Sequence, residues 1–263
     1  MSQEFDRLVS IVKRLRAPGG CPWDREQTNK SILTCLLDEA YEFFEAVDEN
    51  DPDKMREELG DLLLQVVLHA QIASESESGS GAFDIDDVAR DIGDKLIRRH
   101  PHVFGDASAD SSAEVIRNWE RIKKSEYGEE RRKYMTDDIP EALPALFRAE
   151  KTQRRVSQVG FDWSETAPVL DKVEEEFGEF REALQSGDAA DAEEELGDIL
   201  FALVNVGRHA KISAENALRM ATRKFERRFR YVEDRFRELG KDMKAATLEE
   251  MDAYWEESKA RGL

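Results

Sequence analysis

Apolar residues recur at helical spacing along almost the whole chain, and short polar turns separate the periodic stretches. Near the start, Phe5, Leu8 and Val12 fall three to four residues apart with charged residues between them, which predicts an amphipathic helix. No stretch alternates apolar and polar residues between turns, as a half-buried strand would. We therefore predict an all-α protein. The expected helices cover residues 4–16, 31–50, 52–72, 84–99, 112–125, 143–156, 166–186, 189–212, 214–239 and 247–260.

Proline and glycine mark most of the helix boundaries. Pro18-Gly19-Gly20 ends the first helix, and Asp51-Pro52-Asp53 and Gly187-Asp188 each form a tight turn between two long helices. Pro101 ends the helix over residues 84–99, because the residue before a proline avoids the helical region. Residues 126–139 are charged and poorly periodic, which predicts a connection between two domains.

The order of helices and turns before this connection is repeated after it. We therefore expect two tandem helical repeats, each contributing to packing like that of a four-helix bundle. The predicted parts are an N-terminal helical domain over residues 1–128, a charged linker over 129–140 and a C-terminal helical domain over 141–263.

Two predicted helices are apolar on nearly every side. One carries the run from Leu62 to Ile72, and the other carries the run from Ile199 to Val206. A helix that is apolar all round must be covered all round, and a domain of this size has too few helices to do so. We expect a second copy of the chain to supply the missing cover, so that the bundle is completed in a homodimer.

Composition narrows the class of protein. The formal net charge of −19 and the isoelectric point near 4.8 argue against a nucleic-acid binder, because affinity for nucleic acid depends on Lys and Arg at phosphates. No apolar run is long enough for a membrane span, and no secretory signal is visible. The two cysteines, Cys21 and Cys35, form no disulfide framework. We expect a cytoplasmic protein with reduced thiols, no nucleic-acid partner and no membrane partner.

An acidic pattern occurs twice with the same spacing, Glu-x2-Glu-x15-Glu-x2-Asp, and each copy contains the pentapeptide Glu-Glu-Leu-Gly-Asp. Residues three apart on a helix lie about 60° apart around its axis, so each acidic pair shares one face. The tight turn between the two helices lets both faces meet. The residues are Glu39, Glu42, Glu58 and Asp61 in the first copy, and Glu176, Glu179, Glu195 and Asp198 in the second.

Four carboxylates brought together beside apolar residues repel one another unless a cation compensates them. Ligand sets made only of oxygen suit Mg²⁺, with Mn²⁺ as a substitute, and both ions also bind substrate phosphates. A single acidic pair would mean little in a chain with 58 acidic residues, most of which lie on solvated faces. Two pairs repeated at identical spacing favour a metal site.

Basic and aromatic residues follow each acidic pattern in matching order. Lys and Arg can neutralise phosphate oxygens, and Trp can cover a base. For the tryptophans, packing in the core is the alternative role, and for the basic residues it is a solvated surface. The candidate nucleotide contacts are Lys95, Arg99, Trp119 and Lys123 in the first repeat, and Lys224, Arg228, Trp255 and Lys259 in the second.

The chain contains four further motifs: Gly20-Cys21-Pro22-Trp23-Asp24, Leu37-Asp38-Glu39-Ala40-Tyr41-Glu42, Glu57-Glu58-Leu59-Gly60-Asp61 and Arg98-Arg99-His100-Pro101-His102. Together they resemble the MazG family, the two-repeat bacterial nucleoside triphosphate pyrophosphohydrolases of the all-α NTP pyrophosphatase superfamily. The likeness covers essentially the whole chain. It implies Mg²⁺-dependent hydrolysis of NTP or dNTP to the monophosphate and pyrophosphate. It also implies that the acidic residues bind the metal and the basic and aromatic residues bind the nucleotide.

Our mechanistic hypothesis is attack of a metal-activated water on the α-phosphorus, with Glu195 or Glu194 accepting the proton of the water. The rival hypothesis is a non-catalytic helical module that senses nucleotide and metal. The second repeat has Phe161-Asp162 where the first has Cys21-Pro22, so the two sites are not expected to be equivalent.

Overall fold

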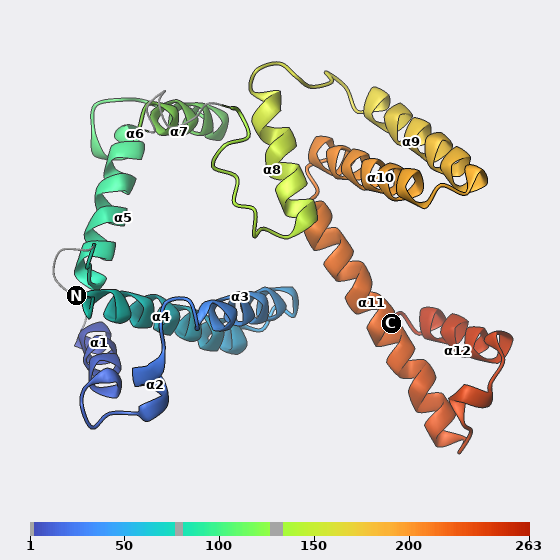
Figure 1. Ribbon diagram of the computed structural model, residues 1–263, viewed down its shortest axis with the longest axis horizontal. Helices are drawn as coiled ribbons and strands as arrows, with labels where there is room; N and C mark the ends of the chain where they lie inside the picture. Colours follow the sequence, from blue (N-terminus) through green and yellow to red (C-terminus); the bar gives the residue numbers. More distant parts are fainter. Residues whose placement is uncertain (1–2, 77–80, 127–133) are drawn as a thin grey trace. The chain divides into compact units, whose positions relative to one another are not determined.

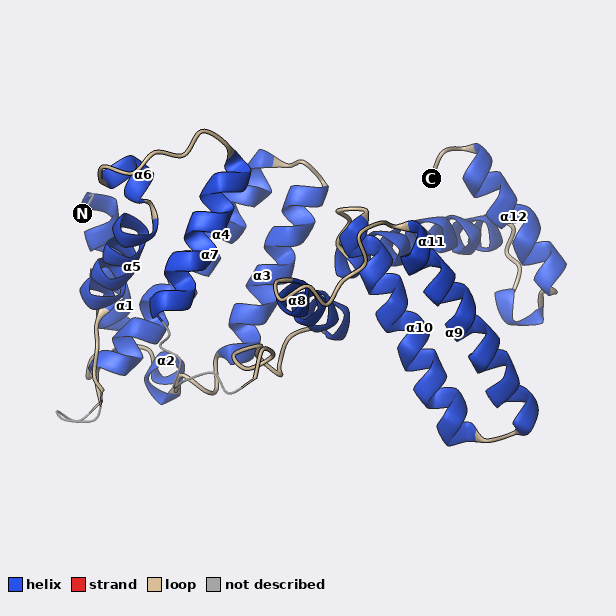
Figure 2. Ribbon diagram, turned by 90° about the horizontal axis from the view of Figure 1, so that it is seen from above, coloured by secondary structure: helices blue, strands red, loops and turns tan. Residues whose placement is uncertain are grey.

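All regular secondary structure in the described residues is helical, and loops join the helices (Figure 2). The structure is a computed structural model that describes residues 3–76, 81–126 and 134–263, and no strand occurs within them. The chain divides into two compact units, Met1–Glu126 and Tyr127–Leu263. The first part of the predicted linker lies outside the described residues, while residues 134–140 contain turns and no helix.

In the first unit, a helical hairpin lies at the centre of the packing, with α1 and α5 in direct contact with it (Figure 1). Helices α3 and α4 make the hairpin, α1 and α5 pack on α4, and α7 packs on α5. Val12, Ile32, Val67 and Leu68 form a buried core between α1 and the hairpin. The elements are α1 (Gln3–Arg16), α2 (Pro22–Glu26), α3 (Leu33–Asp48), α4 (Pro52–Ser74), α5 (Ile85–Arg99), α6 (Pro101–Phe104) and α7 (Ser112–Glu126).

The second unit contains a matching hairpin, formed by α9 and α10. Helix α8 packs on α10 and α11, and α12 packs on α11. The elements are α8 (Ala145–Ser157), α9 (Ala167–Ser186), α10 (Ala189–His209), α11 (Ala214–Glu238), a 3₁₀ turn (Met243–Ala245) and α12 (Leu248–Ala260).

Local sequence explains why both hairpins turn where they do. Asp51 accepts hydrogen bonds from the backbone N–H groups of Asp53 and Lys54, and Asp188 accepts them from Ala190 and Asp191. These caps satisfy donors that the first turn of a helix leaves unpaired. Gly187 ends α9 with φ of 79°, in the left-handed region that glycine reaches without strain.

Three short helical segments were not expected from the sequence: α2, α6 and the 3₁₀ turn. Pro22 and Pro101 begin α2 and α6, because a proline fits the first turn of a helix, where its missing N–H is not needed. Pro101 therefore both ends α5 and starts α6, whereas we had expected only an end. Helices of one turn are too short to show apolar periodicity.

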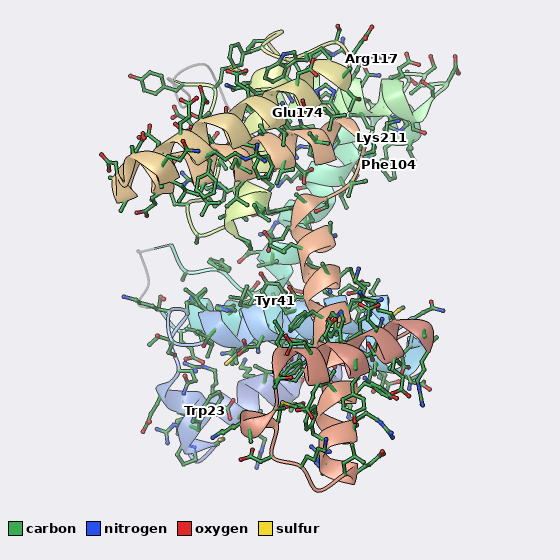
Figure 3. All side chains as sticks on the ribbon, turned by 90° about the vertical axis from the view of Figure 1, so that its right-hand side faces the viewer. Trp23, Tyr41, Phe104, Arg117, Glu174 and Lys211 are labelled. Atoms are coloured by element: carbon green, nitrogen blue, oxygen red, sulfur yellow. The ribbon has the colours of Figure 1, made fainter. Side chains whose placement is uncertain are left out.

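Apolar side chains remain exposed along both hairpins, as expected for helices that are apolar on several sides. Tyr41 on α3 and Glu174 on α9 mark the hairpins in Figure 3. No described helix is long and apolar enough to cross a membrane. The exposed residues include Leu37, Phe44, Leu59, Leu63 and Val66 in the first unit, and Phe177, Leu196, Leu200, Phe201 and Leu203 in the second.

Candidate functional site

Each hairpin holds a cluster of three carboxylates. In the second unit, Glu176 and Glu179 of α9 meet Glu195 of α10, and one oxygen from each lies within 4.8 Å of the others. In the first unit the cluster consists of Glu39 of α3 with Glu58 and Asp61 of α4. Among the described residues, these are the two groups with the spacing of metal ligands.

The structure therefore brings together three of the four predicted ligands in each repeat. Glu42 and Asp198 lie outside the groups, and both are exposed. They remain close enough to act through space, because Glu42 raises the pKa of Glu39 and of Glu58, and Asp198 raises that of Glu195. Glu194, predicted beside Glu195 as a proton acceptor, is exposed and outside the cluster.

The negative charges of the carboxylates in the second cluster are only partly compensated by positive charge. A hydrogen bond with Glu176 is the main cause of the raised pKa of Glu179. Burial is the main cause for Glu195, followed by repulsion from Glu179 and Glu176. The Oε2 atom of Glu195 is buried and has no hydrogen-bond partner. A buried carboxylate oxygen without a partner, on a side chain grouped with two more carboxylates, marks a position that a cation would stabilise.

Lys172 provides the positive charge that this cluster does have. It lies one turn before Glu176 on α9, and its Nζ is 2.8 Å from Glu176 Oε1 and 2.8 Å from Glu175 Oε1. Hydrogen bonds to both carboxylates raise the pKa of Lys172. Lys172 was not among the residues predicted from the sequence, although a lysine four residues before a glutamate is a recognisable helical pair.

The first cluster is compensated by a neutral group instead. Gln65, buried on α4, hydrogen-bonds to Glu39 and lowers its pKa, but burial and repulsion from Asp61 and Glu42 raise that pKa more. The Oε1 atom of Gln65 has no partner. The two clusters thus differ in charge, because one includes an ammonium group and the other an amide.

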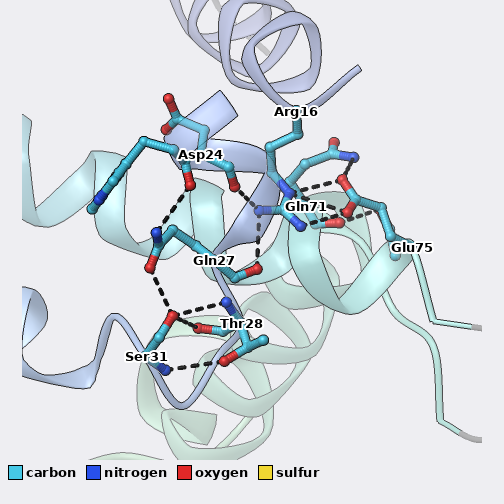
Figure 4. Close-up of polar contacts among 9 residues, drawn as sticks. Arg16, Asp24, Gln27, Thr28, Ser31, Gln71 and Glu75 are labelled. Atoms are coloured by element: carbon cyan, nitrogen blue, oxygen red, sulfur yellow. Dashed lines mark hydrogen bonds and ion pairs between the residues drawn. The ribbon is translucent and has the colours of Figure 1, made fainter. Parts of the chain in front are cut away.

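The loop before α3 is fixed by Arg16 at the end of α1 (Figure 4). Arg16 donates to both carboxylate oxygens of Glu75, with Nε 2.9 Å from Oε1 and Nη2 2.6 Å from Oε2. It also donates to the backbone carbonyls of Asp24 and Gln27. Trp23 in this loop is 56 % exposed (Figure 3). We call residues 20–28 the Trp23 loop.

The corresponding Trp163 loop, residues 159–164, is fixed differently. Asp162 accepts hydrogen bonds from Arg208 and lies 3.0 Å from Nε2 of His209, both on α10. These contacts lower the pKa of Asp162 to about 2. Asn205, buried on α10, accepts from Arg208 and holds its guanidinium in place. Asp162, which stands in place of the proline of the first loop, is therefore an anchor.

The predicted nucleotide contacts of the second unit lie on α11 and α12. The Trp255 ring lies 5.0 Å from that of Phe225, and the Arg228 guanidinium lies 5.8 Å from the Trp255 ring centre. Lys259 pairs with Glu256. Lys224 is exposed. Within the described part of the chain, no hydrogen bond or ion pair joins Lys224, Arg228 or Lys259 to the carboxylate cluster.

The predicted contacts of the first unit form a tighter group. The Arg99 guanidinium and the Lys123 ammonium lie 5.0 and 5.2 Å from the centre of the Trp119 ring. Arg99 is 6 % exposed and forms an ion pair with Glu126. Lys95 is half-buried on α5.

The sequence profile of the MazG nucleotide pyrophosphohydrolase domain matches residues 27–104 and 165–232, and each segment contains one carboxylate cluster. The chain is 49 % identical to the nucleoside triphosphate pyrophosphohydrolase of Escherichia coli K12 over 97 % of both chains. It is 47 % identical to the nucleoside triphosphate pyrophosphohydrolase/pyrophosphatase MazG of Thermotoga maritima, over 97 % of this chain and 95 % of that protein.

Proposed function

The chain belongs to the MazG nucleotide pyrophosphohydrolase family, and we propose that it hydrolyses nucleoside and deoxynucleoside triphosphates to the monophosphate and pyrophosphate. The observation that carries this proposal is the cluster of Glu176, Glu179 and Glu195, in which Glu195 keeps a buried oxygen without a partner. A helical scaffold or a sensor gains nothing from repeating such a costly cluster in both units.

We propose Mg²⁺ as the resident ion, with Mn²⁺ as a substitute. The residues fit such an ion, because every candidate ligand is a carboxylate. In the second cluster, the pKa of Glu195 is raised and one of its carboxylate oxygens is buried without a hydrogen-bond partner. Glu176, Glu179 and Glu195 would hold it, with Asp198 nearby, and Glu39, Glu58 and Asp61 would do so in the first unit with Glu42 nearby. When bound, the ion activates water and neutralises phosphate charge.

Glu195 fits the role of proton acceptor better than Glu194 does. Its carboxylate lies in the cluster, beside the position proposed for the ion and its water. Glu194 is exposed and outside the cluster.

Lys224, Arg228 and Lys259 would hold the triphosphate, and Trp255 would line the nucleotide. These residues lie on α11 and α12, while the carboxylates lie on α9 and α10, and α11 leads away from that hairpin (Figure 1). We propose that a homodimer joins them, so that the carboxylates of one copy face the basic residues of the other. The exposed apolar residues of the hairpins favour such a dimer.

The decisive experiment follows the products of hydrolysis. The purified protein is incubated with each common NTP and dNTP in the presence of Mg²⁺, and pyrophosphate and orthophosphate are measured separately. Release of pyrophosphate with the monophosphate, lost on addition of a chelator, is the expected result. Orthophosphate with the diphosphate would indicate cleavage at another bond, and binding without either product would favour the sensor.

A further inference from the structure

Two polar side chains on α4 keep buried atoms that have no hydrogen-bond partner. Gln65 is 6 % exposed, and its Oε1 atom is buried and unpaired. His69 lies one turn later on the same face of the helix, and its Nε2 atom is also buried and unpaired. An unpaired buried polar atom destabilises a fold, so two of them in successive turns of one helix indicate a missing partner.

The neighbours of these two side chains determine which atoms remain unpaired. The amide NH₂ group of Gln65 donates to Glu39, a member of the first cluster, so the carbonyl end of the amide is left over. Nδ1 of His69 lies 2.7 Å from Oδ1 of Asn29, and this oxygen can only accept, so Nδ1 carries the proton of the ring. Burial lowers the pKa of His69, which favours the neutral ring. Both unpaired atoms are therefore acceptors, and each requires a donor.

The two acceptors lie on a row that leads away from the first cluster. Asp61, Gln65 and His69 follow one another at intervals of four residues, so they share one face of α4 and rise by about 6 Å from one to the next. Asn29 directly follows the Trp23 loop, so the row connects the cluster with that loop. His69 is half-buried and Asn29 is exposed, which places the far end of the row at the surface.

The second unit has no such row. Gln65 and His69 stand four and eight residues after Asp61, and the residues four and eight after Asp198 are Ala202 and Val206. Neither alanine nor valine has a side-chain acceptor. The two units therefore present different chemistry at the same distance from their clusters.

We propose that Gln65 and His69 form a subsite of the first unit that binds hydrogen-bond donors of the nucleoside part of the substrate. This inference rests on the proposed function, because the cluster at Glu39 would have to bind the phosphate end of the same nucleotide. Acceptor atoms repel phosphate oxygens, whereas sugar hydroxyl groups and the amino or ring N–H groups of a base can donate to them. The subsite gives the first unit a selectivity for the nucleoside that the second unit lacks.

The test measures binding to the full chain by isothermal titration calorimetry. The probe is the α,β-methylene analogue of ATP with Mg²⁺, because its α–β linkage cannot be hydrolysed. Every chain carries Glu176→Gln and Glu195→Gln, which remove two carboxylates from the second cluster and confine tight binding to the first unit. Gln65→Met and His69→Phe remove the acceptors with little change in size. Gln185→Met, at an exposed position on α9, is the matched control.

Each variant is combined with the loss of a donor from the probe. The adenosine probe is compared with its 2′-deoxy and 3′-deoxy forms and with its purine riboside form, and a guanosine probe is compared with its inosine form. Gln65→Met and His69→Phe should each weaken binding of the complete probe by about three- to tenfold, as expected for one neutral hydrogen bond. A probe without the matching donor should bind the variant and its parent equally. Equal binding after loss of a hydroxyl identifies the sugar as the donor, and equal binding after loss of the amino group identifies the base.

Thermal melting identifies the folded variants. Unchanged affinity in both folded variants, or the same loss of affinity for every probe, would overturn the inference. The failure of both variants to fold would overturn it as well, because Gln65 and His69 would then have a purely structural role. So would a chain that carries only the two changes in the second cluster and binds no probe. A wild type that releases no pyrophosphate would refute the proposed function, even where the binding data support the subsite.

Discussion

At the scale of single residues, Glu195 is the member of the second cluster on which the proposed reaction depends most. Replacing it with Gln keeps its size but removes both a ligand charge and a base. We expect pyrophosphate release to fall by roughly two to four orders of magnitude, the usual range for a lost acid–base group. Glu193→Gln, at an exposed position on the same helix, should have little effect. A Glu195→Gln enzyme with wild-type turnover would remove Glu195 from the mechanism.

Lys172 offers a second prediction at this scale. Its ammonium group compensates Glu176, whose side chain is 8 % exposed, so Lys172→Gln leaves that carboxylate without its cation. We expect a loss of about 1 kcal/mol and a melting temperature lower by roughly 2–4 °C without metal. Adding Mg²⁺ should then raise the melting temperature more than in the wild type. Lys241→Gln, which breaks an exposed pair with Glu250, is the matched control, and equal Mg²⁺ shifts would contradict the prediction.

The grouping of the carboxylates could be predicted because helical geometry fixes which residues share a face, and the repeat indicated which two helices pair. Glu39 and Glu58 were placed on facing helices from spacing alone, and they do meet. The contacts of Gln65 and Glu126 could not be predicted in this way, because their partners lie on other helices. A single glutamine or glutamate within a helical stretch has no distinctive sequence pattern. Glu42 and Asp198 were expected in the clusters but lie outside them. Spacing gives the face of each helix on which a residue lies, but not how the two helices are rotated against each other.

At the scale of elements, the Trp163 loop depends on one ionised carboxylate. The pKa of Asp162 is about 2 in the folded protein against an ordinary value of 3.8, so its contribution to stability is complete above pH 3.8. This contribution is lost as the pH falls toward 2. Asp162→Asn should therefore flatten the dependence of melting temperature on pH across that window, while Asp171→Asn on α9 should not. Parallel curves for Asp162→Asn and the wild type would show that the anchor is unimportant.

The long helices could be predicted from their period, and the hairpin turns from Asp51 and Gly187, because capping and left-handed turns have strong local signals. Helices α2 and α6 could not, because a single turn has no period and its stability comes from neighbours. Arg16 illustrates this point, since it binds the Trp23 loop directly while Glu75, which lies 59 residues away, holds its guanidinium. Such contacts are tertiary and leave no mark at short range.

At the scale of the whole molecule, the proposed dimer can be tested through the exposed apolar residues of the hairpins. Leu203 on α10 is 44 % exposed, and Leu203→Glu would place a charge in the proposed interface. We expect this variant to remain helical but to shift from dimer to monomer in sedimentation, with loss of activity. Leu248→Glu, at a more exposed apolar position on α12, should leave the dimer intact. A monomeric wild type would contradict the proposal.

A sharper test asks whether each active site is shared between two copies of the chain. Glu195→Gln removes a carboxylate from α10, and Arg228→Ala removes a phosphate contact from α11, so each variant alone should be inactive. In a mixed dimer, a shared arrangement places both changes in one site and leaves the other site intact. Unfolding and refolding the two variants together should therefore restore about a quarter of the wild-type activity, since half of the dimers are mixed and each has one intact site. A mixture that stays inactive while mixed dimers are present would place all the catalytic residues of a site within one chain.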